Sequence, residues 1–133
     1  MGHIHIGYSD HNLDLNMKII QSMDLFLGVP SILLDTDEDR RKMYGKAGEF
    51  RHKSYGVEYR VLSNFWLQSE EHVEWVFKNI YRALEFAENN TIDSETRSII
   101  LDTINNTNKD SAQYLCEIFE INNTIKLKDV CVE

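Results

Sequence analysis

The sequence is poor in the residues that interrupt regular structure. It has one proline and six glycines, all at or before Gly56, and residues 57–133 contain neither. Turn-forming residues mark backbone that adopts special angles, often around functional sites. We therefore predict that the first part of the chain holds the turns and the site, and that the second part is helical.

Cysteine is also scarce, and no segment resembles a targeting sequence. The two cysteines, Cys116 and Cys131, exclude a disulfide scaffold and indicate a reduced, cytoplasmic protein, with a single bridge between them as an open alternative. The first residues lack a basic region followed by a hydrophobic stretch, which excludes a signal peptide. No apolar run approaches the roughly 20 residues that span a bilayer, so we predict no membrane association.

Positive charge is in deficit over the whole chain. The formal net charge of −8 argues against nucleic acid as a partner, because such binding usually needs a basic surface. Disorder is excluded as well, since 42% of the 133 residues are hydrophobic and can form a real core. The length fits one domain of about 100–150 residues.

Three segments alternate apolar and polar residues with a period of two, which is typical of β-strands. They are residues 3–8, 48–53 and 57–62. A turn at Tyr55 and Gly56 joins the last two, so we predict an antiparallel pair. Within each strand, residues two apart face the same side of the sheet. The polar members on these faces are His3, His5, Glu49, Arg51, Lys53, Glu58 and Arg60.

Helical spacing appears between the first and second strands. Residues 13–27 are predicted to form a helix, with Asn12 as its N-cap and Gly28 as its end. Residues 29–34 then form a turn or a second short helix. The acidic stretch from residue 35 to 39 is predicted to be a loop.

The chain after Trp66 is predicted to form three amphipathic helices. Ser69 is a favourable cap for the first. The second runs from about Asp93 to Ile104, and the third carries Leu115 and Cys116. We expect these helices to cover a sheet face, which makes the chain an α+β protein.

Basic residues concentrate in one stretch of this acidic chain. Between Arg40 and Arg60 there are seven basic residues and two glutamates, a local charge of +5. Arginine's planar fork suits phosphate and carboxylate, which indicates a local anion site. The alternative is a solvated basic loop that balances the acidic residues 35–39, and charge alone does not decide between them.

The polar strand faces suggest a more specific site. His3 and His5 project to one side about 6–7 Å apart, and Glu58 and Arg60 do the same on another strand. If these faces align, a hard divalent cation could bind the carboxylate and an imidazole, and the arginine could neutralise phosphate. The alternative is an ordinary solvent-facing strand, which a lone His-x-His pair favours and the full combination does not.

Three stretches together resemble the phage-type carboxylate–amine ligases, a group of the glutamine synthetase and glutamate–cysteine ligase superfamily. They are residues 2–8, 41–51 and 55–66. The resemblance implies an antiparallel sheet of the glutamine synthetase-like catalytic type. Residues 1–66 would be a partial catalytic sheet, and residues 67–133 a helical segment packed on it as one compact unit.

The resemblance also implies a reaction and its residues. ATP would phosphorylate a carboxylate to an acyl phosphate, and an amine would displace the phosphate. His3 and Glu58 would bind Mg²⁺ or Mn²⁺. The residues implied in catalysis are Arg41, Arg51 and Arg60. Those implied in nucleotide binding are His5, Arg41, Lys46 and Arg60. Arg40 is the alternative to Arg41.

The departure from the family pattern matters as much as the match. Members carry an upstream portion with further strands and acidic metal ligands, whereas this chain begins at the His-x-His strand. We therefore expect the distal half of an active site, completed by a second chain or segment, with small-molecule carboxylate and amine substrates. A fragment, a split subunit and an inactive descendant are all compatible with this. The alternatives are a non-catalytic interaction protein and a nucleotide- or anion-binding module.

Overall fold

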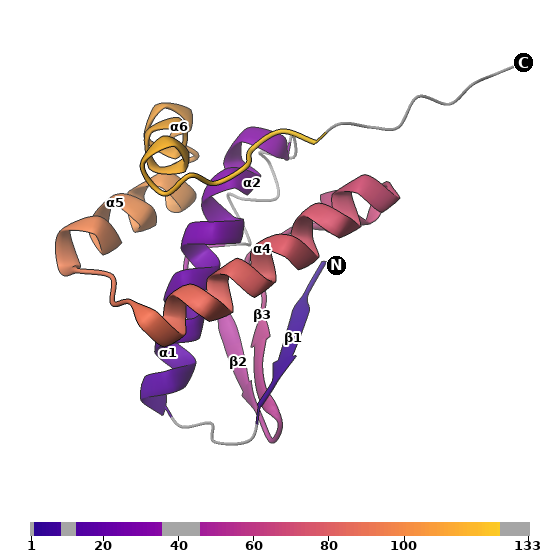
Figure 1. Ribbon diagram of the computed structural model, residues 1–133, viewed down its shortest axis with the longest axis vertical. Coiled ribbons are helices and arrows are strands. Elements are labelled where there is room, and N and C mark those ends of the chain that lie inside the picture. The colour runs from indigo at the N-terminus through magenta and orange to yellow at the C-terminus, as the bar shows by residue number, and fades with distance from the viewer. Residues whose placement is uncertain (1, 9–12, 36–45, 126–133) are drawn as a thin grey trace, which may run out of the picture.

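A small antiparallel sheet forms one side of the molecule (Figure 1). The computed structural model describes residues 2–8, 13–35 and 46–125. Three strands pair in the order β1-β3-β2, with bounds β1 Ile4–Gly7, β2 Phe50–Lys53 and β3 Gly56–Tyr59. All three predicted strands are present, each shorter than predicted. The mixed α+β class is confirmed.

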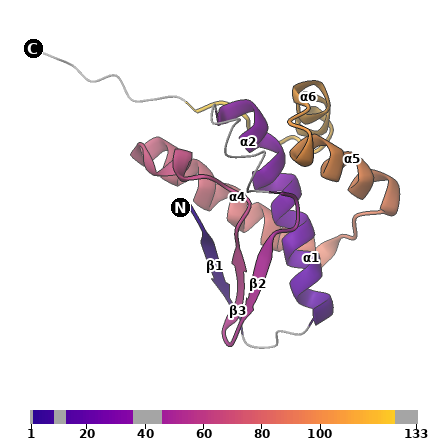
Figure 2. The same cartoon turned by 180° about the vertical axis from the view of Figure 1, so that it is seen from behind.

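The two faces of the sheet differ in character. Ile4, Val57 and Tyr59 are buried in the core, on the side where the helices lie. The polar residues of the alternating pattern are on the other side, which is open in the view from behind (Figure 2). Within the part of the chain that the structure describes, helices cover one face of the sheet and leave the polar face accessible.

One helical segment passes through the core. It consists of α1 Leu13–Met23, a π-helical turn Asp24–Gly28 and α2 Val29–Leu34. The prediction that Gly28 ends the first helix is wrong, because its backbone is helical with φ −61° and ψ −48°. A Cβ at Gly28 would lie 2.7 Å from Cδ1 of Ile104 and 3.0 Å from the hydroxyl of Tyr59. Glycine therefore lets these neighbours pack closely. Pro30 has no N–H to donate to the carbonyl of Phe26 four residues earlier, and Nδ2 of Asn79 donates to that carbonyl instead at 3.0 Å.

This segment also corrects the expectation about membrane-spanning length. Leu13–Leu34 is a 22-residue helix that is long and apolar enough to cross a membrane by length and composition. Its side chains are directed into the protein, since 72% of its apolar window is buried. We conclude that it is the core helix of this fold.

Three further helices follow, and the first two begin where the sequence predicts. They are α4 Glu70–Asn89, α5 Ser94–Asn105 and α6 Lys109–Ile118, preceded by a short 3₁₀ helix, Asn64–Leu67. The side chains of Ser69 and Asp93 accept N-cap hydrogen bonds from the first turns of α4 and α5. The expectation that all three cover the sheet is wrong for α5 and α6, which pack against each other and against α2. The core helical segment lies between α6 and the strands (Figure 1).

A buried carboxylate ties these parts together. Asp24 is fully buried and accepts hydrogen bonds from the Tyr59 hydroxyl at 2.7 Å and from Arg97 at 2.7 Å. The backbone N–H of Gly48 also donates to it. Burial raises the pKa of Asp24, and Arg97 and Tyr59 oppose that shift. The cluster joins the core helix to β3, to α5 and to the loop before β2.

Of the two cysteines predicted to be reduced, the structure describes Cys116. Cys116 is a buried free thiol, and burial raises its pKa to about 11. Cys131, the alternative bridge partner, lies outside the described residues, as do the predicted cap Asn12 and the acidic stretch beyond Asp35. Cys116 therefore has a structural role in the packing of α6.

Candidate functional site

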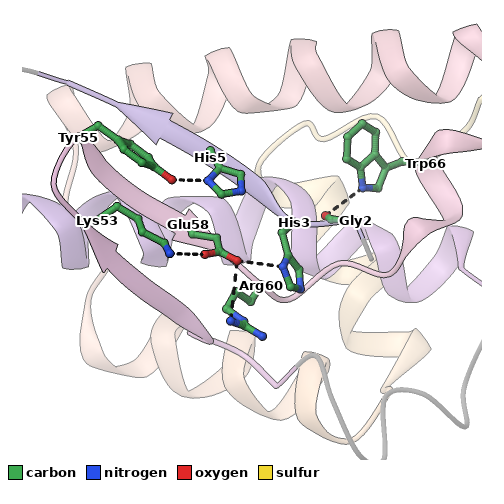
Figure 3. Close-up of polar contacts among 8 residues, drawn as sticks. All are labelled: Gly2, His3, His5, Lys53, Tyr55, Glu58, Arg60 and Trp66. Carbon is green, nitrogen blue, oxygen red and sulfur yellow. Dashed lines mark hydrogen bonds and ion pairs between the residues drawn. The ribbon is translucent and has the colours of Figure 1, made fainter.

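Glu58 is the centre of the polar sheet face (Figure 3). Its side chain is only 7% exposed, and three side chains surround its carboxylate. Nδ1 of His3 lies 2.9 Å from Oε1, Nζ of Lys53 lies 3.2 Å from Oε2, and an Arg60 guanidinium nitrogen lies 3.8 Å from Oε1. The structure therefore brings the first imidazole together with the acid–guanidinium pair, as expected.

Strand register explains this arrangement. In the sheet, His5 of β1 and Arg51 of β2 both lie directly opposite Glu58 of β3. Since side chains two residues apart share a face, His3 and Arg60 also fall on this face. The backbone N–H of Arg60 donates to the Glu49 carbonyl at 2.9 Å, which continues the pairing past the end of β3.

The chain just before β1 is held in place by close packing. Nε1 of Trp66 donates a hydrogen bond to the carbonyl oxygen of Gly2 at 3.2 Å. A Cβ at Gly2 would lie 2.0 Å from the carbonyl oxygen of Ser63, so no larger residue fits there. This contact fixes the backbone beside His3 and directs its ring toward Glu58 (Figure 3).

The site favours the protonation states that metal ligands require. Burial acts to raise the pKa of Glu58, but the ion pair with Lys53, followed by Arg60 and His3, lowers it below its ordinary value. Burial and the nearby Arg60 lower the pKa of His3, although Glu58 opposes that shift. Near neutral pH the site therefore contains a carboxylate and a neutral imidazole, which are the ligand forms that bind cations.

Arg60 has unused hydrogen-bonding capacity. Among the described residues, one of its terminal guanidinium nitrogens is buried and makes no hydrogen bond. Its 3.8 Å separation from Glu58 is too long for one. Buried polar groups are normally satisfied, so an exception in a native fold indicates a ligand or a solvent partner. A phosphate or carboxylate oxygen would satisfy a guanidinium donor.

His5 has a different partner from His3. Its Nδ1 is hydrogen-bonded to the hydroxyl of Tyr55, a residue of the hairpin turn that joins β2 and β3. The two rings are 5.9 Å apart between centroids. Tyr55 was predicted as a turn residue and not as a site residue, because a tyrosine in a turn has no periodic signal. Lys53 was on the predicted polar face and could have been selected by the same alternation that indicated Arg51.

Among the described residues, Lys46 and Arg51 do not take part in the ion-pair cluster at the Glu58 carboxylate. Lys46 donates a hydrogen bond to the backbone carbonyl of Asn105 at 3.2 Å and is therefore tied to α5. Arg51 is exposed on the polar face, across the strand pair from Glu58. Arg40 and Arg41 lie outside the described residues. The structure thus brings together His3, Glu58 and Arg60, and adds Lys53.

The residues fit half of a divalent cation site. Nδ1 of His3 and Oε1 of Glu58 are hydrogen-bonded at 2.9 Å, so a cation bound by both atoms would take the place of the proton between them. Within residues 2–8, 13–35 and 46–125, no group of three or more His, Cys, Asp or Glu side chains could hold a metal. Further ligands would have to be phosphate, water or residues from elsewhere.

A groove adjoins the two histidines. It has a volume of about 390 Å³ and lies between β1 and α4, beside His3 and His5. Apolar side chains from α4, among them Val76 and Ile80, form its other wall. The groove could exclude water from an apolar part of a ligand whose anionic end reaches the polar face.

These features define an α+β protein with a cation-rich, carboxylate-centred site on the open face of an antiparallel sheet. The family of phage phiEco32-like COOH.NH2 ligase-type 2 proteins matches residues 1–110, so the chain belongs to this family. The match confirms the family resemblance and extends it from the strands through α5. Comparison with curated proteins and with solved structures gave no match.

Proposed function

We propose that this chain takes part in ATP-dependent ligation of a carboxylate to an amine through an acyl phosphate. Membership of the COOH.NH2 ligase-type family supports a ligase function in general. The observation that carries the ATP-dependent form is the buried Arg60 nitrogen without an acceptor, beside the Glu58–His3 pair. Phosphoryl transfer depends mainly on positioned cations, and this face supplies them.

Each side chain has a proposed task. His3 and Glu58 would hold Mg²⁺ or Mn²⁺, which supplies charge neutralisation at the nucleotide phosphates when bound. Arg60 binds the transferring phosphoryl group, and Arg51 binds phosphate or the substrate carboxylate. His5 lies by the nucleotide phosphates. Arg41 and Lys46 are kept as proposed phosphate ligands, with Arg40 as the alternative to Arg41.

The setting of the site is part of the proposal. The sheet is of the glutamine synthetase-like type, and the chain acts in the cytoplasm on small-molecule substrates. Because the described residues offer two metal ligands, a second chain or segment supplies the remaining acidic ligands and completes the site. The apolar groove beside His3 protects the acyl phosphate from water.

Titration with Mg·ATP, followed by calorimetry, tests this function. We expect Glu58→Gln, which is nearly isosteric, to abolish Mg²⁺-dependent nucleotide binding while the protein stays folded. Arg60→Lys keeps the charge but loses the planar fork, so we expect affinity to fall about tenfold. Glu74→Gln on the exposed surface of α4 is the matched control and should bind as wild type. Unchanged binding in both site variants would refute the proposal.

A second candidate function is an anion-binding module without ligation. It is favoured by the ion pair of Lys53 with Glu58, which neutralises the carboxylate without a metal. Such a module should bind ATP equally well with and without Mg²⁺. It should also release no ADP when supplied with mixed carboxylates and amines, whereas the ligase, completed by its partner, should do so.

A further inference from the structure

We propose that Lys53 is a built-in counter-cation of Glu58 that a divalent cation must displace, and that the displaced ammonium then binds the anionic ligand on the same face. This inference rests on the proposed function, because it takes Glu58 as a metal ligand. It assigns a positioning role to a residue outside the predicted ligand set. It also makes metal and phosphate binding depend on one another.

The two oxygens of the Glu58 carboxylate have different partners. Oε1 of Glu58 faces His3 and Arg60, while Oε2 forms the ion pair with Lys53 at 3.2 Å. A carboxylate that is only 7% exposed is costly without a cation nearby, and Lys53 provides one. The resting site is therefore already neutralised without a metal.

A divalent cation and the Lys53 ammonium would compete for the Glu58 carboxylate. A divalent cation bound to Glu58 would lie about 2.1 Å from a carboxylate oxygen. Lys53 is 3.2 Å from the other oxygen of the same carboxylate, so the two cations would repel each other at short range. One of them must leave for the other to bind well.

The side chain of Lys53 is better placed to leave the carboxylate than that of Arg60. Its side chain is 33% exposed, against 21% for Arg60, and it is the last residue of β2. The residue opposite it on β3 is Gly56, which is in turn paired with Gly7 on β1. Tyr55 packs over this pair of glycines, because a Cβ at Gly7 would lie 3.9 Å from its Cβ and Cδ2 atoms, so the lysine would move outward into solvent and not across the strands. A compact ammonium on a flexible stem suits this role better than a guanidinium.

Coupling between the two ligands follows. A metal alone would leave the displaced ammonium without a partner, whereas a metal–nucleotide complex would supply phosphate oxygens for it. Linkage then requires that nucleotide raise metal affinity and that metal raise nucleotide affinity by the same factor. Lys53 would thereby reduce binding of metal without nucleotide.

The test measures Mn²⁺ binding to the full chain by electron paramagnetic resonance, with and without ATP. We expect Lys53→Met to bind Mn²⁺ alone about tenfold more tightly than wild type, and to gain less from ATP. Lys78→Met, at an exposed position on α4, should match wild type. Glu58→Gln should bind no Mn²⁺ in any background.

The outcomes separate the two proposals. If wild type and Lys53→Met bind Mn²⁺ equally tightly, and Glu58→Gln abolishes that binding, the role of Lys53 is overturned and the metal site stands. Weaker binding in Lys53→Met would overturn it as well. Absence of Mn²⁺ binding in wild type and in Lys53→Met would refute the metal site and hence both proposals. If Lys53→Met does not fold, the ¹³Cε signal of Lys53 in wild-type protein decides, since the inference requires it to shift on addition of Mg²⁺.

Discussion

Glu58 and His3 give the stability of the protein a definite dependence on pH. The pKa of Glu58 is lowered from an ordinary value of 4.5, so its ionised form stabilises the fold above that pH. This contribution is lost as the pH falls through the folded-state pKa. The pKa of His3 is lowered from 6.5, so protonation of His3 also disfavours the fold as the pH falls below that value. Both residues therefore act in the same direction.

We predict that Glu58→Gln lowers the melting temperature at neutral pH, and that its difference from wild type shrinks as the pH falls from about 5 to 3. In acid the wild-type carboxyl becomes neutral, as glutamine is at every pH. Thermal unfolding followed by circular dichroism across this range measures the effect. Glu74→Gln at an exposed position is the control and should unfold close to wild type. A pH-independent difference for Glu58→Gln would contradict the assigned ionisation.

At the residue scale, alternation along strands was enough to predict which polar groups share a face. His3, Glu58 and Arg60 lie on one face, as this alternation predicts, because β1 and β2 both pair with β3 in registers that keep the polar positions aligned. The ion pair of Lys53 could not be predicted, since the choice of partner depends on rotamers and on pairing between strands. The attachment of Lys46 to Asn105 joins residues 59 apart in the chain, which no local pattern indicates.

At the element scale, helix beginnings were easier to predict than helix ends. Ser69 and Asp93 cap their helices through local hydrogen bonds that the sequence makes visible. Glycine often ends a helix for an equally local reason, but at Gly28 close packing against Ile104 and Tyr59 overrides it. The helix continues because tertiary contacts require a residue without a side chain at that point.

The substitution Gly28→Ala sets the helix propensity of alanine against the close packing around this position. Alanine is favoured over glycine in a helix by about 1 kcal/mol, but overpacking a buried site costs about 1–3 kcal/mol. We expect net destabilisation in urea unfolding, because Tyr59 is held by Asp24 and cannot move away. Ile104→Val removes the Cδ1 atom that lies 2.7 Å from the added Cβ. The double variant should therefore be more stable than the sum of the single effects, and simple additivity would contradict the packing explanation.

At the scale of the whole molecule, one buried cluster joins the sheet-bearing part to the helical part. Asp24 of the core helix contacts Tyr59 of β3 and Arg97 of α5. The family match runs from residue 1 to 110 and so includes both parts. This cluster could not be predicted, because an aspartate within an apolar helix and an arginine 73 positions later share no local pattern.

Arg97→Met should therefore weaken the whole fold. Removing one partner leaves a buried charge unpaired, which costs about 3–5 kcal/mol of unfolding free energy. Because the folded-state pKa of Asp24 is raised from 3.8, its contribution is fully present below that pH and is lost as the pH rises. Without Arg97 the pKa of Asp24 rises further, so the variant should be closest to wild type in acid, where the carboxyl is protonated in both proteins. Urea unfolding of Arg97→Met and of Asp24→Asn/Arg97→Met at pH 5 and 7 measures this. The double variant should recover much of the loss, and equal losses in both would show that Arg97 acts through packing and not through the charge of Asp24.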